Sequence, residues 1–439
     1  MSVNELDKSI GLLCYSTRCE GIGGRIRSKY EDFQVEEIIN PKFEVKENPN
    51  STHRYPIYML EKIGIDTIHA CKLIEMKLGG KVRYLGLKDA KASTKQYVSP
   101  TSLKVRILDN LQIDNKILLK LIGYSSRPIT RRDLVGNRFR IKVVGVNFNR
   151  VEGCLNEVAS NLSRGKVPNF FGYQRFGSKR PINHLIGREL VKRRFREALT
   201  IFLSHPSDYD SEERRIFREL CKESDYRRAL SMLKPEKPEL DLEVLVLRRL
   251  VKDPNRCIEA LRELPLTLRR LFINAYQSYI CNRVLSSAVN AEMDLMKVEE
   301  GDYCGEFDLI QGRLIKVSRY FTSTSPSNPI HKGSDISTIS IPLIPIVGYT
   351  YRTTKNRFDV FIDQVLEEEG VKARDFYIKE LPEVSVEGGF RVAPLLCKTF
   401  DWNFDQNGIS LTMDLFKGSY ATVILREIIK PRNPVEAGF

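Results

Sequence analysis

A single aspartate stands in a strongly basic stretch of the sequence, RYLGLKDAKASTKQYVSP at residues 83–100. Asp89 follows Lys88 directly, and Lys91 and Lys95 come close behind it. A cation next to a partly desolvated carboxylate favours the ionised form of that carboxylate and holds its orientation. An ionised, well-aimed carboxylate can stabilise a positive centre, bond to carbon or remove a proton. An isolated aspartate is more often a turn residue, so the rest of the sequence must decide between these interpretations.

Other common kinds of catalytic site have little support in the sequence. The nine cysteines form no C-x-x-C pair, and the five histidines have no partner at metal-ligand or Ser-His-Asp spacing. We therefore expect reduced cysteines and no metal. A metal-dependent nuclease would need clustered carboxylates or histidines. A methyltransferase would need a glycine-rich turn that opens a helix, whereas GIGGRIR precedes a predicted strand.

The charge balance indicates the kind of partner. The chain of 439 residues has 70 Lys and Arg against 56 Asp and Glu, a net charge of +14, which favours a polyanion such as nucleic acid. A generally basic proteome would give the same excess, so charge alone leaves both explanations open. No apolar run approaches the ~20 residues that cross a bilayer, and the first residues lack the features of a signal peptide. We expect a cytoplasmic protein.

Hydrophobic patterning predicts strands at both ends of the chain and helices in the middle. Residues 24–147 contain short alternating segments such as FQVEEI and FRIKVVGV, with one helix between them that Asp66 caps and Gly79 ends. A further helix is predicted to end at Gly165. Residues 183–290 read as charged helices, and another helix is expected to end at Gly370. The last segment, through LFKGSYATVILREII, is predicted to contain about three strands, and the class is α+β.

Five segments in this order resemble one known family. They are GRIRSKYEDFQVEEI, YLGLKDAKASTKQ, VPNFFGYQRFGSKRPINHLIG, NAYQSYICNRVLSS and LFKGSYATVILREI. The set resembles the TruD family of tRNA pseudouridine synthases, to which the eukaryotic pseudouridine synthase 7 enzymes belong. One motif alone would mean little, but together they span nearly the whole chain.

The resemblance implies an isomerase that needs no cofactor and no metal for its chemistry. It places the essential carboxylate on Asp89. It also places a catalytic cation on Arg27, although this chain has arginine where the family often has lysine and Tyr30 where proline is usual. In a strand, Lys88 would point away from Asp89, so contact with a phosphate or with solvent is expected for it.

The resemblance implies further substrate-binding residues in NFFGYQRFG. Phe171 would stack on the target base, and Asn169 would orient Asp89 or a base edge. Gln174 and Arg175 would shape the pocket or bind a phosphate. Phe170 and Phe176 are expected in the core. For Gln277, Ser278 and Asn282, lining the cleft and tying the helices to the rest of the chain stay open as alternatives.

The implied fold is a catalytic domain with a mixed, mainly antiparallel sheet, built from both chain ends and carrying a family-specific α/β insertion. We expect the catalytic domain at residues 1–195 and 391–439 and the insertion at 196–390, with tRNA held in a basic cleft between them. The resemblance favours the D-arm uridine at tRNA position 13. Position 35 of tyrosine tRNA, and a tRNA-binding protein without catalysis, are the alternatives.

Overall fold

The large sheet joins the two ends of the chain. The computed structural model describes residues 2–88, 90–233, 241–321 and 337–439. Within them, nine strands form one sheet in the order β12-β13-β7-β1-β4-β2-β6-β5, with β3 on β4. The strands are β1 (Phe33–Ile39), β2 (Tyr55–Ile63), β3 (Val82–Tyr84), β4 (Ser93–Pro100), β5 (Asn110–Ile113), β6 (Ile117–Ser125), β7 (Leu134–Val144), β12 (Cys397–Asp405) and β13 (Gly408–Phe416).

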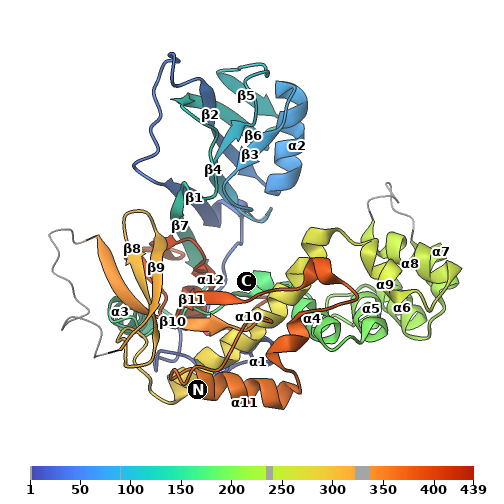
Figure 1. The fold of residues 1–439 in the computed structure, drawn as a ribbon. Coiled ribbons are helices and arrows are strands. Elements are labelled where there is room, and N and C mark those ends of the chain that lie inside the picture. Colours follow the sequence, from blue (N-terminus) through green and yellow to red (C-terminus); the bar gives the residue numbers. More distant parts are fainter. Residues whose placement is uncertain (1, 89, 234–240, 322–336) are drawn as a thin grey trace.

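Only the β1–β4 contact in this sheet is parallel among the described residues, and it is short. It aligns residues 34–36 with residues 93–95, whereas β1 pairs with β7 antiparallel along its whole length. Beyond the contact, β2–β6 and the helix α2 (Thr67–Leu78) form a lobe that projects from the rest of the molecule (Figure 1). The lobe has its own core around Tyr58, Ile74 and Val98. The α+β class and the mixed, mainly antiparallel sheet are confirmed.

A second sheet and a group of helices fill the middle of the sequence. The four-stranded sheet, β11-β10-β8-β9 in the described part of the chain, lies beside the end of β7. Its strands are β8 (Tyr303–Asp308), β9 (Arg313–Arg319), β10 (Thr338–Ile346) and β11 (Gly389–Val392). The helices of this part are α4 (Asn183–Val191), α5 (Phe195–Ser204), α6 (Glu212–Lys222), α7 (Tyr226–Met232), α8 (Leu242–Lys252), α9 (Cys257–Arg262), α10 (Leu266–Asn290) and α11 (Asp359–Glu369).

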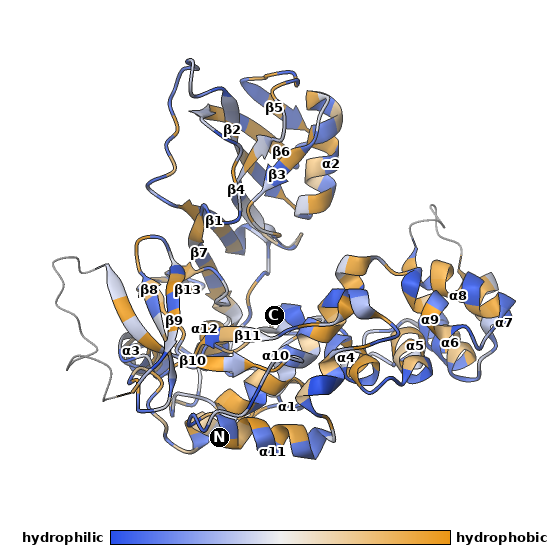
Figure 2. Cartoon of the chain, in the orientation of Figure 1, coloured by the Kyte–Doolittle hydropathy of each residue, from blue (hydrophilic) through white to orange (hydrophobic). Residues whose placement is uncertain are grey.

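Hydrophilic and hydrophobic residues alternate along α5–α8 in Figure 2, as expected for helices that bury one face. The long helix α10 packs against α4 in the centre of the molecule. The remaining helices are α1 (Glu5–Ser9), α3 (Phe148–Ser163) and α12 (Ala421–Ile429), with single 3₁₀ turns at Tyr30–Asp32, Tyr173–Arg175, Ala373–Phe376 and Pro382–Val384.

The predicted helix signals are confirmed where local chemistry sets them. The Asp66 side chain accepts hydrogen bonds from the backbone N–H groups of Ile68 and His69, and Gly79 ends α2 with a φ of +74°. Gly370 ends α11 in the same left-handed conformation, with a φ of +62°. These signals lie within a few residues of the structure that they specify.

The last segment contains three strands, as predicted, namely β11, β12 and β13. The expectation of a strand after Gly418 is wrong, because residues 421–429 form the helix α12. All of its residues are buried, so its apolar run is continuous and has no periodicity that separates a buried helix from a buried strand. Arg426 is 0% exposed and bonds to Asp7 at 2.6 Å. The Tyr173 hydroxyl donates to the other oxygen of Asp7 at 2.5 Å. This chain of bonds ties α12 and the 3₁₀ turn at Tyr173–Arg175 to the N-terminal segment.

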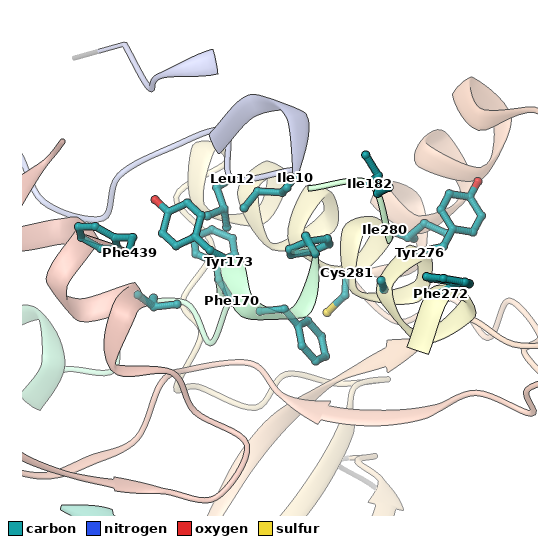
Figure 3. Packing of buried hydrophobic residues seen from close by; sticks show 14 of the residues in the cluster. Ile10, Leu12, Phe170, Tyr173, Ile182, Phe272, Tyr276, Ile280, Cys281 and Phe439 are labelled. Atoms are coloured by element: carbon teal, nitrogen blue, oxygen red, sulfur yellow. The ribbon is translucent and has the colours of Figure 1, made fainter. Parts of the chain in front are cut away.

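The core beneath the NFFGYQRFG segment forms between the N-terminal residues and α10. Phe170 and Tyr173 lie beside Ile10, Leu12 and Cys281 in Figure 3. Phe170 and Phe176 are both fully buried, which confirms their predicted place in the core. The core therefore holds the segment in place, and within it Gln174 and Arg175 are only half-buried.

The expectation that all cysteines are reduced is wrong for one pair. Cys19 and Cys154 form a disulfide, with their Cα atoms 5.4 Å apart and 135 residues between them in the sequence. The other seven cysteines are free. The fold brings the pair together across α3 and the N-terminal segment, and sequence spacing carries no signal of that contact.

Candidate active site

Two neighbouring hollows are lined by those predicted site residues that the structure describes. The first, the Arg27 hollow, has a volume of about 190 Å³ and is lined by Arg27, Phe33, Leu87, Lys88, Gln174 and Tyr420 among others. The second, the Phe171 hollow, has a volume of about 420 Å³ and includes Asn169, Phe171, Arg175, Arg313, Arg391 and Lys417. The rings of Phe171 and Tyr420, one from each hollow, are 6.2 Å apart. Residues from six distant segments thus line two neighbouring hollows.

Asp89, the predicted catalytic carboxylate, lies outside the described residues. Its sequence neighbours Leu87, Lys88 and Ala92 all line the Arg27 hollow. The motif that carries the predicted carboxylate therefore contributes to the same hollow as Arg27.

Two contacts hold the guanidinium group of Arg27. The guanidinium carbon lies 4.0 Å from the centre of the Phe33 ring, a cation–π contact, and Nη1 donates to the Gly438 carbonyl at 2.9 Å. The backbone of Arg27 has a φ of +56°, in the left-handed region. Phe33 begins β1, so the motif RSKYEDF contains both the cation and the ring that supports it.

Lys88 does not have the environment expected from the sequence. The strand β3 ends at Tyr84, and Lys88 lies in the loop after it. Its side chain is 8% exposed, and its Nζ atom is 2.7 Å from the Glu37 carboxylate, whose side chain is fully buried. The expectation of a solvent-facing side chain on a strand is therefore wrong, because Glu37 draws the ammonium group inward. Contact with a phosphate stays a prediction.

A buried polar network holds the loop that carries Lys88. Burial raises the pKa of Glu37, and the cation of Lys88 together with the N–H groups of Tyr97 and Gly86 opposes that rise. The backbone N–H of Lys88 donates to the Thr67 hydroxyl at 2.9 Å, and that hydroxyl donates to Gln96 at 3.0 Å. Backbone and side chain of Lys88 are thus fixed from the lobe and from β1.

Gly172 allows the segment with Phe171 to approach α12 closely. A Cβ atom at Gly172 would lie 2.7 Å from the Thr422 hydroxyl and 2.9 Å from the Tyr420 ring. The next residues continue the contact, since the Thr422 hydroxyl donates to the Gln174 amide oxygen at 3.3 Å. Gln174 thereby lines the Arg27 hollow, whereas Asn169, Phe171 and Arg175 line the Phe171 hollow.

Arg391 is one of the residues of this site that sequence analysis missed, and it makes the most contacts with the predicted residues. Its guanidinium carbon lies 3.8 Å from the centre of the Phe171 ring, and its nitrogens donate to the carbonyls of Asn169, Phe170 and Gly418. It also donates to the Asn169 side-chain oxygen at 2.9 Å. Because it lies 220 residues further along the chain, on β11, no local pattern connects it with Phe171.

The helix α10 supports the same segment. Asn282, fully buried, accepts a hydrogen bond from the Phe171 N–H at 2.8 Å and donates to the Phe171 carbonyl at 3.1 Å. Gln277 and Ser278 line the Phe171 hollow. Both alternatives therefore occur: Asn282 ties α10 to the segment, whereas Gln277 and Ser278 line the Phe171 hollow.

Comparison with known proteins identifies the family. A family model described as tRNA pseudouridine synthase D (TruD) matches residues 9–428. The chain belongs to the TruD family of tRNA pseudouridine synthases. The assignment made from its motifs, with the isomerase class that it implies, is confirmed.

Relatives and a solved structure agree over the full length of this TruD family member. A protein of Methanosarcina mazei named probable tRNA pseudouridine synthase D is 31% identical over 99% of the chain and 100% of its own length. A protein of the same name from Pyrococcus furiosus is 32% identical over 96% and 99%. A crystal structure from Methanosarcina mazei, also assigned as tRNA pseudouridine synthase D, has a TM-score of 0.80 at 30% identity and covers 99% of this chain and 100% of its own.

Two further features bear on the kind of site. Among the described residues, no helix combines the length and apolar character needed to span a membrane. Over the same ranges, no group of three His, Cys, Asp or Glu side chains is arranged to hold a metal ion.

Proposed function

We propose that this chain converts the uridine at position 13 of the tRNA D-arm to pseudouridine, in the cytoplasm. The observation that carries the proposal is the Arg27 hollow, which collects Arg27, Gln174 and the sequence neighbours of Asp89 in a member of the TruD family. The alternative target within the same chemistry is position 35 of tyrosine tRNA. We also propose that residues 1–195 and 391–439 form the catalytic domain and residues 196–390 the insertion.

The chemistry sets three demands on these residues. The N1–C1′ bond must break, the uracil must stay bound and turn, and C5 must bond to C1′ while the hydrogen of C5 leaves. A carboxylate at Asp89 would stabilise the positive charge that develops at C1′, bond to it or remove a ribose proton. Arg27, fixed by Phe33 and Gly438, would keep that carboxylate ionised.

The Phe171 hollow would receive the uridine once it leaves the RNA stack. Phe171 is 7% exposed, and Arg391 covers its ring at 3.8 Å, so a base would reach the ring only on the side open to the hollow. Asn169 and Arg391 hold the segment in place, and Arg175, 5.5 Å from the ring centre, would bind a phosphate or the base edge. Lys88 would contact a phosphate while its ammonium group stays paired with the Glu37 carboxylate.

The position of the product tests the proposal. Purified protein is incubated with unmodified tRNA transcripts, and pseudouridine is mapped by a chemical label that stops reverse transcription. We expect one new pseudouridine at position 13, with added chelator having no effect once the RNA is folded. A transcript with cytidine at position 13 is the control. Product at position 35 alone favours the alternative target, and binding without any product favours a non-catalytic tRNA-binding protein.

Replacing Phe171 tests the proposed base stacking. Stacking on an aromatic ring is worth about 1–3 kcal/mol per base, so Phe171→Ala should slow single-turnover pseudouridine formation by roughly 5- to 150-fold. The salt dependence of RNA binding should stay the same, because no cation is removed. Phe171→Tyr keeps a ring and should stay active, and Phe170→Leu controls for damage to the core. An unchanged single-turnover rate in Phe171→Ala would assign the ring to packing alone.

A further inference from the structure

Residues 433–439 form a turn that packs against the segment of Arg27. In this 433–439 turn, the Ala437 carbonyl accepts a hydrogen bond from the Ile26 N–H, and the Gly438 carbonyl accepts one from Nη1 of Arg27, both at 2.9 Å. Gly438 has a φ of +90°, and a Cβ atom there would lie 2.2 Å from the Ile26 carbonyl oxygen. Only glycine allows this approach. The turn therefore contacts both the backbone before Arg27 and its guanidinium group.

Hydrogen bonds within the 433–439 turn fix its shape. The Asn433 side-chain oxygen accepts hydrogen bonds from the backbone N–H groups of Val435 and Glu436 at 3.1 and 3.3 Å. The Phe439 N–H donates to the Pro434 carbonyl at 3.0 Å. An asparagine side chain that bonds the backbone just after it closes a turn. The carbonyl groups near the end of the turn consequently have fixed directions.

Phe439 anchors the 433–439 turn in the core. It is 6% exposed, and its ring meets the Tyr173 ring edge-on, with the ring centres 5.3 Å apart (Figure 3). Edge-to-face aromatic pairs have a preferred geometry, so this contact fixes the two rings relative to each other. Gln174, next to Tyr173, lines the Arg27 hollow. Phe439 thus joins the turn to a segment that forms part of the wall of that hollow.

Arg27 has a backbone conformation that needs support from outside its own segment. Its φ of +56° lies in the left-handed region, which residues other than glycine occupy mainly where the surrounding structure holds them. Phe33 contacts the guanidinium group, whereas the 433–439 turn bonds both to that group and to the residue before Arg27. The turn lies beyond residues 9–428, which the family model matches, so the family motifs assign it no role.

We propose that Gly438 and Phe439 are positioning residues for pseudouridine formation, which act by holding the guanidinium group of Arg27 at the Arg27 hollow. The proposal rests on the proposed function, because it takes Arg27 as the catalytic cation. A displacement of about 1 Å at a reacting centre can cost about a hundredfold in rate. The turn sets the position of Arg27 through one carbonyl and one buried ring, so small changes in it should reach the reaction.

A double-mutant cycle tests the proposal. Phe439→Ala should lower the single-turnover rate at saturating tRNA by about 10- to 100-fold. The tRNA affinity should stay within about twofold of wild type, because phosphate contacts dominate RNA binding. In the Arg27→Ala background, Phe439→Ala should cause no further loss of rate, because the group that it positions is already gone. Phe439→Leu keeps an apolar side chain of similar bulk and should retain most of the rate.

Two further variants separate positioning from general damage to the fold. Phe217→Ala removes an equally buried ring, 1% exposed, from α6 among the distant helices and should leave the rate of the folded protein unchanged (Figure 1). Asn433→Ala opens the turn without emptying the core, so it decides the test if Phe439→Ala does not fold. Its rate should fall in the same direction, and it too should have no effect in the Arg27→Ala background. Urea unfolding shows which variants are folded under the assay conditions.

The outcomes separate this proposal from the proposed function. Equal losses in the wild-type and Arg27→Ala backgrounds would assign the turn to packing alone and overturn the proposal. Wild-type rates in both Phe439→Ala and Asn433→Ala would also overturn it, while a slow Arg27→Ala protein leaves the proposed function intact. If Arg27→Ala itself has the wild-type rate, or the wild-type protein forms no pseudouridine, the proposed function fails and takes this proposal with it.

Discussion

Asp89→Asn should abolish pseudouridine formation while leaving tRNA affinity nearly unchanged. The amide keeps the shape of the side chain but cannot carry the negative charge that C1′ requires or act as a nucleophile or base. We expect the single-turnover rate to fall by more than about a thousandfold, at the upper part of the range for a catalytic acid or base. Affinity should persist because phosphate contacts dominate RNA binding.

The measurement pairs single-turnover rates with binding titrations on the same protein preparations. Asp89→Glu serves as the matched variant, because it keeps the charge and moves it by one methylene. Measurable turnover by Asp89→Asn would contradict the assignment of the carboxylate. A parallel loss of tRNA affinity would instead indicate a role in binding.

Lys88→Ala should destabilise the whole fold more than it weakens RNA binding. The substitution leaves the fully buried Glu37 carboxyl group without its counter-ion, and breaking such a buried pair costs about 3–5 kcal/mol. The sequence alone, which places Lys88 on a strand facing solvent or phosphate, predicts mainly a loss of RNA affinity. Urea unfolding followed by fluorescence separates the two outcomes through the midpoint of the transition.

Two variants control for this effect. The double variant Glu37→Gln/Lys88→Met removes both charges and should recover most of the lost stability, since no buried charge is left unpaired. Arg27→Ala should reduce the single-turnover rate and leave the urea midpoint close to that of wild type. If the Lys88→Ala protein unfolds at the wild-type midpoint and has lost only RNA affinity, Lys88 binds phosphate and does not stabilise the fold.

The parts of the fold that sequence predicts are those that local chemistry determines. The helix α2 is bounded by a capping aspartate and a glycine with positive φ, and both signals lie within the helix and its ends. Local signals do not identify the helix α12. Its residues are buried on every side, and its charged pair, Arg426 and Glu427, lies inside the core. A buried helix and a buried strand then have the same pattern.

The candidate site likewise contains residues that local motifs identify and residues that only the tertiary fold brings in. The motifs locate Arg27, Gln174 and Phe171, because each belongs to a continuous segment that resembles the family. The motifs do not indicate Arg391, since its contact with Phe171 depends on how β11 packs against a loop far away in the sequence. The ion pair of Lys88 with Glu37 is equally a product of tertiary packing, and the sequence pattern gave no sign of it.

If Asp89 is the catalytic carboxylate, this chain joins C5 of a tRNA uridine to C1′ only when that carboxylate is present. The hydrogen at C5 must leave when that bond forms, so tRNA transcribed with uridine tritiated at C5 reports the reaction as tritium released into water. We expect release of one equivalent per tRNA by the wild-type protein, from position 13, and none by Asp89→Asn. No release by the wild-type protein, or release by Asp89→Asn at a comparable rate, would contradict it.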